Sequence, residues 1–410
     1  MRLKVLVSAY ACEPGKGSEP EVGWNVVRQA CKYHDIWVIT RSNNRGPIEA
    51  AVANDPLQRV EFIYFDLPRW LAFWKKGRRG VRVYYYIWQI GVYFVARRLH
   101  RQIGFDVLHH VTLVKYWVPS FLALLPLPFL WGPVGGGDTM PPGLLSTLSW
   151  RGRAYEVVRH LARSLASFDP FLRLTARRAT LALATTFETK ERLCALGCKR
   201  VLTFSQVGLK SEDILSLNCH PLRSDKCFRV VSVGELLHLK GFHLGLVAFA
   251  RLHRRFPTSE CWLIGGGPER RRLERLAKRL NVSESVTFWG TLPRSEVMQK
   301  LKMCDVLLQP ALHDSGGYAV VEAMAVGLPV VCLNLGGIAF QVTEETGIKV
   351  SATSPEQTVT ELAAAITELA RDTSRRALLG QAASKRVFEQ FNWDTKGAQL
   401  SQIYSQLASV

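Results

Sequence analysis

The chain has 410 residues, of which 48% are hydrophobic, and its 53 Lys and Arg against 34 Asp and Glu give a formal net charge of +19. This length suits two domains of about 200 residues each, and the hydrophobic content excludes a disordered or fibrous protein. The positive charge predicts an anionic partner, which could be a phosphorylated substrate, anionic lipid or nucleic acid.

Cysteine usage and apolar runs indicate the compartment. Nine cysteines are spread along the chain without a CxxC pair or a Cys/His metal spacing, which predicts reduced thiols and a cytosolic protein. Residues 1–7 superficially resemble the start of a signal peptide, but the apolar run breaks at residues 13–15, so we interpret it as a first strand. Runs such as 84–96 are shorter than the ~18 residues that cross a bilayer.

The first half of the chain alternates strand and helix signals. A glycine-rich loop over 13–19 follows the first strand and leads into a helix predicted over 22–33. The predicted strands are 3–9, 35–40, 60–65, 106–110, 128–131, 181–186 and 201–204. Short buried strands that alternate with helices predict a parallel, doubly wound sheet.

Residues 206–226 read as a linker, and the same pattern then restarts. The second set of predicted strands is 228–234, 261–264, 286–289, 305–309, 330–333 and 348–350, and the helices between them include 241–256, 271–280 and 356–371. An amphipathic segment over 391–407 closes the chain. We therefore expect an α/β protein with two Rossmann-like domains that face each other across a cleft and bind ligands at the carboxyl ends of their strands.

A polar, glycine-rich turn at 313–317 runs into an apolar helix that holds one carboxylate, Glu322. A buried, unpaired carboxylate is costly, so Glu322 needs a dedicated partner. The turn supplies Asp314, Gly316 and Gly317, and a helix N-terminus offers free N–H groups to an anion. These features predict a site for an anionic ligand with hydroxyl groups, such as a nucleotide sugar.

Several motifs resemble those of the GT-B glycosyltransferases, specifically the large family 4 of retaining enzymes. The matching stretches are 233–241 (VGELLHLKG), 264–269 (IGGGPE), 288–290 (FWG), Asp314-x7-Glu322, 323–325 (AMA) and 327–331 (GLPVV), together with residues 11–14, 17–19 and 23–25 in the first half. The resemblance covers most of the chain and is most specific in the second half.

The resemblance implies a role for each matching position. Glu322 would bind the ribose hydroxyls, Asp314 would lie against the donor sugar, and Lys240 would neutralise the diphosphate. The backbone of Gly316, Gly317, Tyr318, Gly234 and Gly266 would line the donor site, and Gly15, Gly17, Ser18 and Glu19 would form a loop for the diphosphate or acceptor. Residues 1–205 would then be the acceptor-binding domain, 227–385 the donor-binding domain, and 386–410 a helix that returns to the first domain.

The sequence departs from the family at two places. Glu235 stands where an arginine is usual, and no histidine follows the predicted strand 128–131, where the run 131–138 ends at Asp138. His110 and Asp138 are the weak candidates for that missing role. A histidine at the end of a strand is more often a packing residue, and Asp138 is equally consistent with a turn.

The implied reaction is transfer of a hexose, with retention, from a nucleotide sugar to a lipid-linked or glycan acceptor. UDP-sugars are favoured as donors and GDP-sugars are the alternative. No cofactor is expected, and no Asp-x-Asp motif indicates a metal that bridges the diphosphate. Two other functions stay open: a nucleotide-sugar epimerase of the same architecture, and a non-catalytic subunit that binds nucleotide sugars.

Residues 66–103 combine nine Lys and Arg with nine aromatic side chains and a single acid, Asp66. Such a segment can lie in the interface of an anionic membrane, which predicts a peripheral enzyme on the inner face of the membrane. The alternative is a helix that covers the first core with a solvated basic face. Nucleic-acid binding would also use these residue types, but no nucleic-acid-binding module is recognisable.

Overall fold

The computed structural model describes residues 2–72, 80–217 and 227–409. The chain forms two compact units, and both are assembled from segments that are separate in sequence. Unit 1 contains Met1–Gly137, His160–Gln206 and Trp393–Val410, and unit 2 contains Asp138–Arg159 and Val207–Asn392. The domain boundaries at 205, 226 and 385 stay a prediction.

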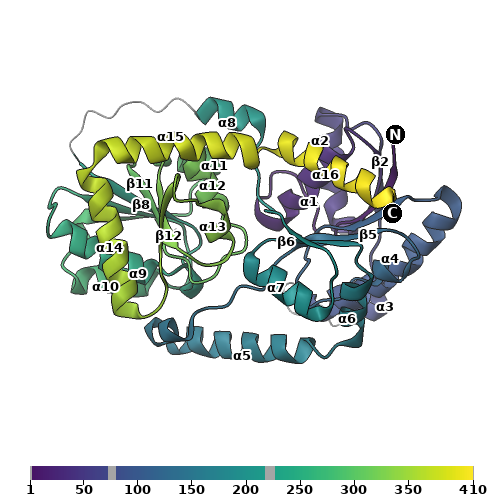
Figure 1. Cartoon of the computed structure of the whole chain (residues 1–410), viewed down its shortest axis with the longest axis horizontal. Coiled ribbons are helices and arrows are strands. Elements are labelled where there is room, and N and C mark those ends of the chain that lie inside the picture. Colours follow the sequence, from purple (N-terminus) through teal and green to yellow (C-terminus); the bar gives the residue numbers. More distant parts are fainter. Residues whose placement is uncertain (1, 73–79, 218–226, 410) are drawn as a thin grey trace. The chain divides into compact units, whose positions relative to one another are not determined.

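A seven-stranded sheet forms the centre of unit 1, with the order β3-β2-β1-β4-β5-β6-β7 (Figure 1). Its strands are β1 (Lys4–Ser8), β2 (Asp35–Thr40), β3 (Val60–Tyr64), β4 (Val107–His110), β5 (Phe129–Val134), β6 (Leu181–Ala184) and β7 (Val201–Thr203). All neighbours pair in parallel. Each strand lies within three residues of its predicted bounds, and the predicted parallel sheet is confirmed.

Helices connect the strands of unit 1 and bury an apolar core against the sheet. They are α1 (Ser18–Ala30), α2 (Arg45–Asn54), α3 (Arg69–Ala72), α4 (Val81–Ile103), α6 (Pro170–Arg178), α7 (Phe187–Leu196) and α16 (Trp393–Ala408). Side-chain caps fix where some of them begin: Asp169 accepts from the N–H of Phe171, and Thr186 accepts from that of Thr189. The C-terminal α16 packs on α1, where Gln29 donates to Asp394.

Unit 2 contains a second parallel sheet of six strands, with the order β10-β9-β8-β11-β12-β13. Its strands are β8 (Arg229–Val233), β9 (Glu260–Ile264), β10 (Val286–Gly290), β11 (Val306–Gln309), β12 (Val330–Leu333) and β13 (Gly347–Val350). In both sheets the order reverses next to the first strand, which is the Rossmann arrangement. Two Rossmann-like sheets therefore confirm the predicted fold class.

The helices of unit 2 cover its sheet with two separate apolar clusters. They are α8 (Ser211–Leu217), α9 (Phe242–His253), α10 (Arg270–Arg279), α11 (Arg294–Leu301), α12 (Tyr318–Ala325), α13 (Gly336–Gln341), α14 (Pro355–Arg371) and α15 (Thr373–Gln390). Residues of α9 and α14 belong to one cluster and residues of α11 and α12 to the other, while α15 contributes Leu379 to the first and Ala383 and Val387 to the second. Helix α8 lies within the predicted linker, of which residues 218–226 fall outside the described part.

One further helix, α5 (Trp150–Ala166), is continuous although its residues 150–159 are grouped with unit 2 and the rest with unit 1.

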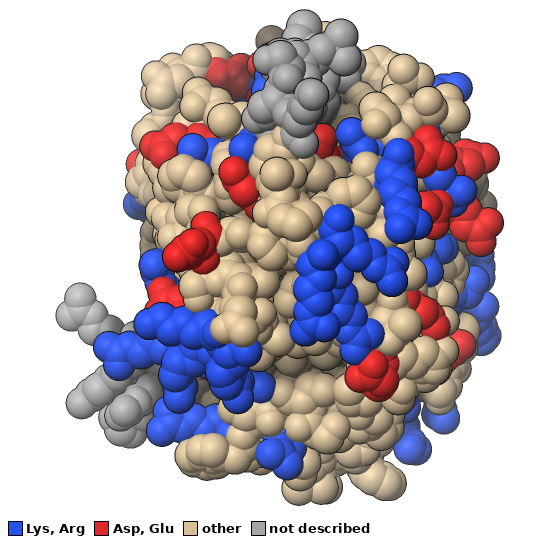
Figure 2. All heavy atoms as spheres, turned by 90° about the vertical axis from the view of Figure 1, so that its left-hand side faces the viewer, with Lys and Arg blue, Asp and Glu red and all other residues tan. Residues whose placement is uncertain are grey.

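Basic residues are also abundant on unit 2. Figure 2 shows Lys and Arg gathered in patches on the side covered by α9, α10 and α14, where Arg254, Arg255, Arg271 and Arg275 are exposed.

Within the basic aromatic segment 66–103, helix α4 buries some of the aromatic residues, while Trp70 of α3 is 72% exposed. Tyr84, Tyr85 and Trp88 of α4 are at most 4% exposed and belong to the apolar core of unit 1. These three aromatic residues fit the alternative prediction, a helix that covers the core. Phe94 does not, because it is 61% exposed. Residues 73–79 of the segment, with two of its aromatic residues, lie outside the described residues.

Over the described residues, none of the helices combines the length and apolar character needed to cross a membrane. In the same part of the chain, no group of three or more His, Cys, Asp or Glu side chains is arranged to hold a metal ion. The eight cysteines that the structure describes are all free thiols, and most are buried.

Candidate functional site

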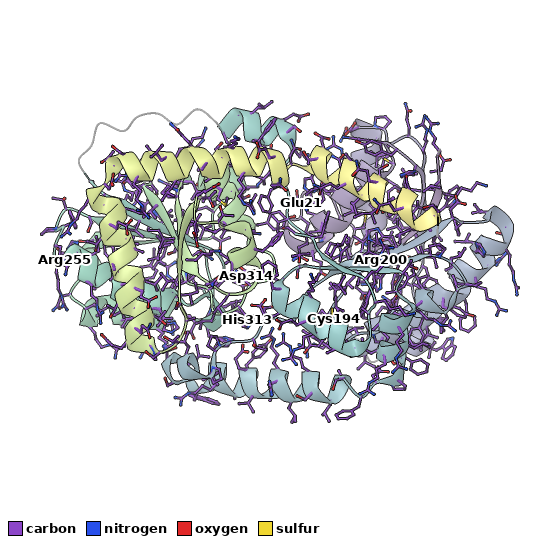
Figure 3. The ribbon with its side chains drawn as sticks, in the orientation of Figure 1. Glu21, Cys194, Arg200, Arg255, His313 and Asp314 are labelled. Carbon is purple, nitrogen blue, oxygen red and sulfur yellow. The ribbon has the colours of Figure 1, made fainter. Side chains whose placement is uncertain are left out.

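The turn before α12 is built around the carboxylate of Asp314. It follows β11 at the carboxyl end of the sheet of unit 2, where ligands bind in such folds. Oδ1 of Asp314 accepts hydrogen bonds from the N–H groups of Gly316, at 3.0 Å, and Gly317, at 3.2 Å. Gly317 has a φ of 66°, which favours glycine and lets the chain enter the helix directly. Asp314 therefore lies in the turn that leads into α12 (Figure 3).

Lys240 completes the set of donors around Asp314. Its Nζ lies 2.5 Å from Oδ2 of Asp314, and both side chains are mostly buried. Gly241 makes this approach possible: it has a φ of +65°, and a Cβ there would lie 1.9 Å from the carbonyl oxygen of Pro310. The loop after β8 is thereby held against the loop after β11.

We call the donors that converge on Asp314 the cradle: one ammonium group and two N–H groups of the turn before α12. Phosphate groups favour donors of these two kinds. The two sequence-predicted groups, Lys240 and the 316–317 backbone, are therefore brought together. In this structure the carboxylate of the chain itself takes their hydrogen bonds, so an anionic ligand would compete with Asp314 for them.

Two more glycine turns adjoin the cradle. A Cβ on Gly234 would lie 3.6 Å from Cε of Lys240, and a Cβ on Gly265 would lie 1.9 Å from the carbonyl oxygen of Gly234. The carbonyl of Gly266 accepts from the N–H of Leu236 at 2.8 Å. The predicted residues Gly234, Gly266 and Lys240 thus lie on adjoining loops. Glu235 is on the same turn and is exposed.

Glu322 has the partner that its burial requires. It is 9% exposed, and its Oε1 lies 2.6 Å from Nε of Arg294, the first residue of α11. Arg294 also donates to Asp213 at 3.1 Å. The expectation that Glu322 needs a dedicated partner is confirmed, and the partner is a cation on a neighbouring helix.

A buried network lies directly behind the cradle, at the residue before Asp314. The ring of His313 lies between two carboxylates, with Nε2 3.0 Å from Glu156 and Nδ1 3.5 Å from Asp138. Asp138 also accepts from the hydroxyl of Ser315 at 2.8 Å. His238, two residues before Lys240, bonds to the same oxygen of Glu156 at 3.1 Å. The network therefore ties both loops of the cradle to one buried acid.

The pKa values of this network reflect its charges. Burial acts to raise the pKa of Asp138, but the hydrogen bonds from His313 and Ser315 outweigh it and hold the pKa at about 2. Burial likewise acts to raise the pKa of Glu156, and the two histidines lower it. Burial acts to lower the pKa of His313, and the two carboxylates raise it instead. The network therefore favours a charged His313 between ionised acids.

The turn is also fixed from α13. The side chain of Gln341 donates from Nε2 to the carbonyl oxygen of Gly316, and the N–H of Gly337 donates to the carbonyl oxygen of Asp314 at 2.8 Å. Both the side chain and the backbone of the Asp314 turn are therefore held by other parts of the chain.

Unit 1 places the other predicted residues as follows. Gly15 and Gly17 have φ values of 69° and 70°, and α1 begins at Ser18. The carboxylate of Glu19 accepts from the N–H of Leu113, and burial raises its pKa. His110 is buried next to Tyr85, and its pKa is lowered to about 3. This placement gives His110 a packing role, and we leave it out of the proposed site.

Sequence reasoning missed several residues of this site. Arg294, Gln341 and Glu156 approach the cradle from distant segments, and nothing in their local sequence marks them. His313 lies in the predicted turn 313–317, but the sequence assigns it no role. The only signal in the sequence is general: a carboxylate buried in a helix requires a cation or several donors from elsewhere. Asp138 of this network is among the weak candidates from the sequence.

Comparison with known proteins identifies the second half of the chain. The model of the family described as Glycosyl transferases group 1 matches residues 221–386. A GDP-mannose-dependent alpha-(1-6)-phosphatidylinositol monomannoside mannosyltransferase of Mycolicibacterium smegmatis is 32% identical over 184 residues, which cover 43% of this chain and 47% of that protein. The matches to the first curated relatives all span less than half of those proteins.

Solved structures match over the whole chain. A sucrose-phosphate synthase from Thermosynechococcus elongatus has a TM-score of 0.67 and 20% identity and covers 100% of both chains. HepE of Anabaena, solved in complex with UDP and glucose, has a TM-score of 0.63 and 18% identity over 99% of this chain and 100% of its own. The match at residues 221–386 assigns this segment to the glycosyl transferases group 1 family, and the two Rossmann-like sheets together with the whole-chain structural matches show that the chain has the GT-B fold.

Proposed function

We propose that this protein is a glycosyltransferase that uses a nucleotide-sugar donor. The observation that carries the proposal is the convergence of Lys240 and the N–H groups of Gly316 and Gly317 on one carboxylate at the end of β11. A diphosphate needs this combination of a cation and preorganised backbone donors. The related mannosyltransferase uses GDP-mannose by name, and HepE was solved with UDP, so both nucleotides are candidates.

The donor would lie along the carboxyl edge of the unit 2 sheet. Its diphosphate would take over the Lys240 and α12 donors, and Glu322 would accept hydrogen bonds from the ribose hydroxyls. Asp314, once displaced from Lys240, would be positioned to accept from hydroxyls of the sugar. Arg294 donates to Oε1 of Glu322, and a carboxylate has lone pairs for further bonds, so Glu322 could accept hydrogen bonds from two hydroxyl groups.

Transfer requires stabilisation of the departing diphosphate. Positive charge develops at the anomeric carbon and negative charge on the leaving oxygen, so fixed donors at that oxygen lower the barrier. We assign this role to Lys240 and the N-terminus of α12. The acceptor hydroxyl would attack from the face of the leaving group and pass its proton to the diphosphate, which gives retention without a covalent sugar–enzyme bond.

The acceptor is proposed to be a lipid-linked molecule or a glycan. The support is the net charge of +19 and the phosphatidylinositol acceptor in the name of the mycobacterial relative. The loop over Gly15, Gly17, Ser18 and Glu19, at the end of β1, is the proposed contact of unit 1 with the diphosphate or acceptor.

Incubation with a panel of UDP- and GDP-sugars, with and without glycan and lipid-linked acceptors, tests the proposal. We expect release of nucleoside diphosphate that depends on the acceptor and persists in EDTA, because protein groups rather than a metal are proposed to meet the diphosphate charge. An isomerised donor would instead identify an epimerase. Donor binding without any turnover would identify a non-catalytic binding subunit.

A further inference from the structure

Helix α5 exposes an apolar stripe and buries two of its charged side chains. Trp150, Val157, Val158, Leu161 and Leu165 are each between 59% and 70% exposed. The charged side chains of Glu156 and Arg163 are 8% and 5% exposed. A surface helix of a globular protein normally shows the opposite pattern, with its apolar stripe facing the core.

The two buried charged side chains of α5 make specific contacts. Glu156 bonds to His313, His238 and Arg159 at 3.0, 3.1 and 3.2 Å. The guanidinium of Arg163 donates to the carbonyl oxygen of Gly136 and lies 4.8 Å from the ring centre of Trp117. Because these contacts fix which way the helix faces, the apolar side cannot turn inwards without breaking them.

The exposed residues form one stripe. At about 100° per residue along a helix, positions 150, 154, 157, 158, 161 and 165 lie on a single face that runs the length of α5. After the helix ends, Phe168 is 73% exposed and Phe171 is 46% exposed. An apolar stripe of this length on one helix indicates that another apolar phase covers it.

The charges beside the stripe are positive. Arg151, Arg153 and Arg173 are exposed on α5 and α6, as are Arg177 and Arg178. The two acids of residues 150–178 are engaged elsewhere: Glu156 is buried, and Asp169 caps α6 and accepts from Tyr86. An apolar stripe that ends in a tryptophan and is bordered by arginines matches the chemistry of an anionic bilayer surface.

We propose that α5 docks this protein onto an anionic lipid bilayer, with the 150–165 stripe in the headgroup boundary and the flanking arginines on lipid phosphates. A second copy of the chain is a poorer occupant, because pairing the same face of two copies brings their arginines together. The basic patch on α9 and α10 is also a poorer surface, since none of residues 251–302, which the structure describes in full, is a large exposed hydrophobic. The proposal depends on α5 alone and does not require the donor chemistry.

Co-flotation of the whole chain with lipid vesicles in a sucrose gradient tests the proposal. Vesicles that mix phosphatidylcholine with anionic phosphatidylglycerol are compared with vesicles of phosphatidylcholine alone. We expect the wild type to float with the anionic vesicles at low salt. The double variant Leu161→Glu/Leu165→Glu should lose at least about tenfold of its partitioning.

Matched variants distinguish α5 from other surfaces. Leu378→Glu replaces a leucine that is 67% exposed on α15, and Phe94→Glu replaces a residue that is 61% exposed on α4; both should float like the wild type. Nucleoside diphosphate binding and circular dichroism report whether each variant is folded, independently of lipid.

Three results would overturn the proposal. The first is a wild type that stays at the bottom with anionic vesicles, and the second is loss of flotation in Phe94→Glu but not in the α5 variant. The third is a wild-type dimer in sedimentation velocity that Leu161→Glu/Leu165→Glu dissociates, since that would assign the stripe to a second copy. None of these results bears on whether the donor site is active, which the nucleotide-sugar panel decides separately.

Discussion

At the scale of single residues, the carboxylate of Asp314 accepts the hydrogen bonds of all the cradle donors. It pairs with Lys240 and with two N–H groups of the α12 turn, and all three donors are the ones assigned to the diphosphate. The carboxylate thus has two proposed roles. It pairs with Lys240 and the two N–H groups when they do not hold a diphosphate, and it contacts the sugar when a nucleotide sugar is bound. These roles make opposite demands on binding and on transfer.

The variant Asp314→Asn separates the two roles. Removing the negative charge frees Lys240, so we expect nucleoside diphosphate to bind at least as tightly as to the wild type. Transfer should fall by about 10²-fold or more, because the carboxylate that would orient the sugar is lost. Binding is measured by calorimetry and transfer by product formation. If binding and transfer both collapse, competition between Asp314 and the diphosphate is refuted.

His313 gives the network behind the cradle a pH dependence. Its pKa is raised above 6.5 in the folded state, so the stability it contributes is present in full below pH 6.5 and is lost as the pH rises through the raised value. Asp138, with a pKa of about 2, contributes stability that is present above pH 4 or so and is lost only as the pH falls towards 2.

The variant His313→Gln isolates the contribution of the histidine. Between pH 6 and pH 9, the free energy of unfolding should fall more steeply in the wild type than in the variant, by about 1.4 kcal/mol for each unit by which the pKa is raised. Urea unfolding of both proteins at each pH measures this free energy. Parallel curves for the two proteins across this range would show that His313 is not charged between the carboxylates.

At the scale of elements, glycines decide how closely the loops of unit 2 approach. Gly241 follows the short helix that carries Lys240, and it packs on the carbonyl of Pro310 after β11. Neither the positive φ nor this contact tolerates a side chain. The donor cradle therefore depends on the geometry of a β8 loop and a β11 loop that meet at this one residue.

Replacing Gly241 by Ala should lower the free energy of unfolding by more than about 2 kcal/mol and should weaken nucleotide binding. Gly46, an exposed residue of α2 with no heavy atom within 4 Å of a Cβ, is the matched control. Gly46→Ala should leave binding intact and raise stability by up to about 1 kcal/mol. Chemical denaturation and calorimetry on both variants check this; equal effects would remove the special status of Gly241.

Much of the element pattern could be predicted from the chain itself. Short apolar runs bounded by turn residues placed all thirteen strands close to their observed bounds, since buried parallel strands read as continuous apolar segments. The linker reading was less successful, because α8 has only seven residues and too little periodicity to be recognised. For the aromatic residues of α4 the sequence leaves two predictions open, a membrane interface and a helix over the core, because composition alone does not show which side of a helix faces the core.

At the scale of the whole molecule, each unit has its own sheet and its own apolar core. The chain order does not coincide with these units, since residues 138–159 are grouped with unit 2 and α16 is grouped with unit 1. The long-range partners of the site follow from this. Glu156 reaches His313 across more than 150 positions, and such a pairing has no signature in a single sequence.

Ligand binding links the site to the stability of the molecule. A nucleoside diphosphate that binds only the folded protein stabilises it by about 2.7 kcal/mol at one hundred times its Kd. The gain should appear in the unfolding transition of unit 2, because the assigned donors all belong to that unit. Hydrogen exchange of the β11 and β12 amides, with and without ligand, shows where the protection arises; protection confined to unit 1 would contradict the assignment.

The most direct test of the central claim is the affinity of UDP and GDP for Glu322→Gln, measured by isothermal titration calorimetry beside the wild type. Glu356→Gln makes the same chemical change on a side chain that is 82% exposed on α14 and serves as the control. We predict micromolar to millimolar binding of at least one nucleotide to the wild type and the control, and at least about a tenfold loss in Glu322→Gln, equivalent to about 1.4 kcal/mol. Equal affinity in all three proteins, or no binding by the wild type, would contradict the assignment of this site to a nucleotide sugar.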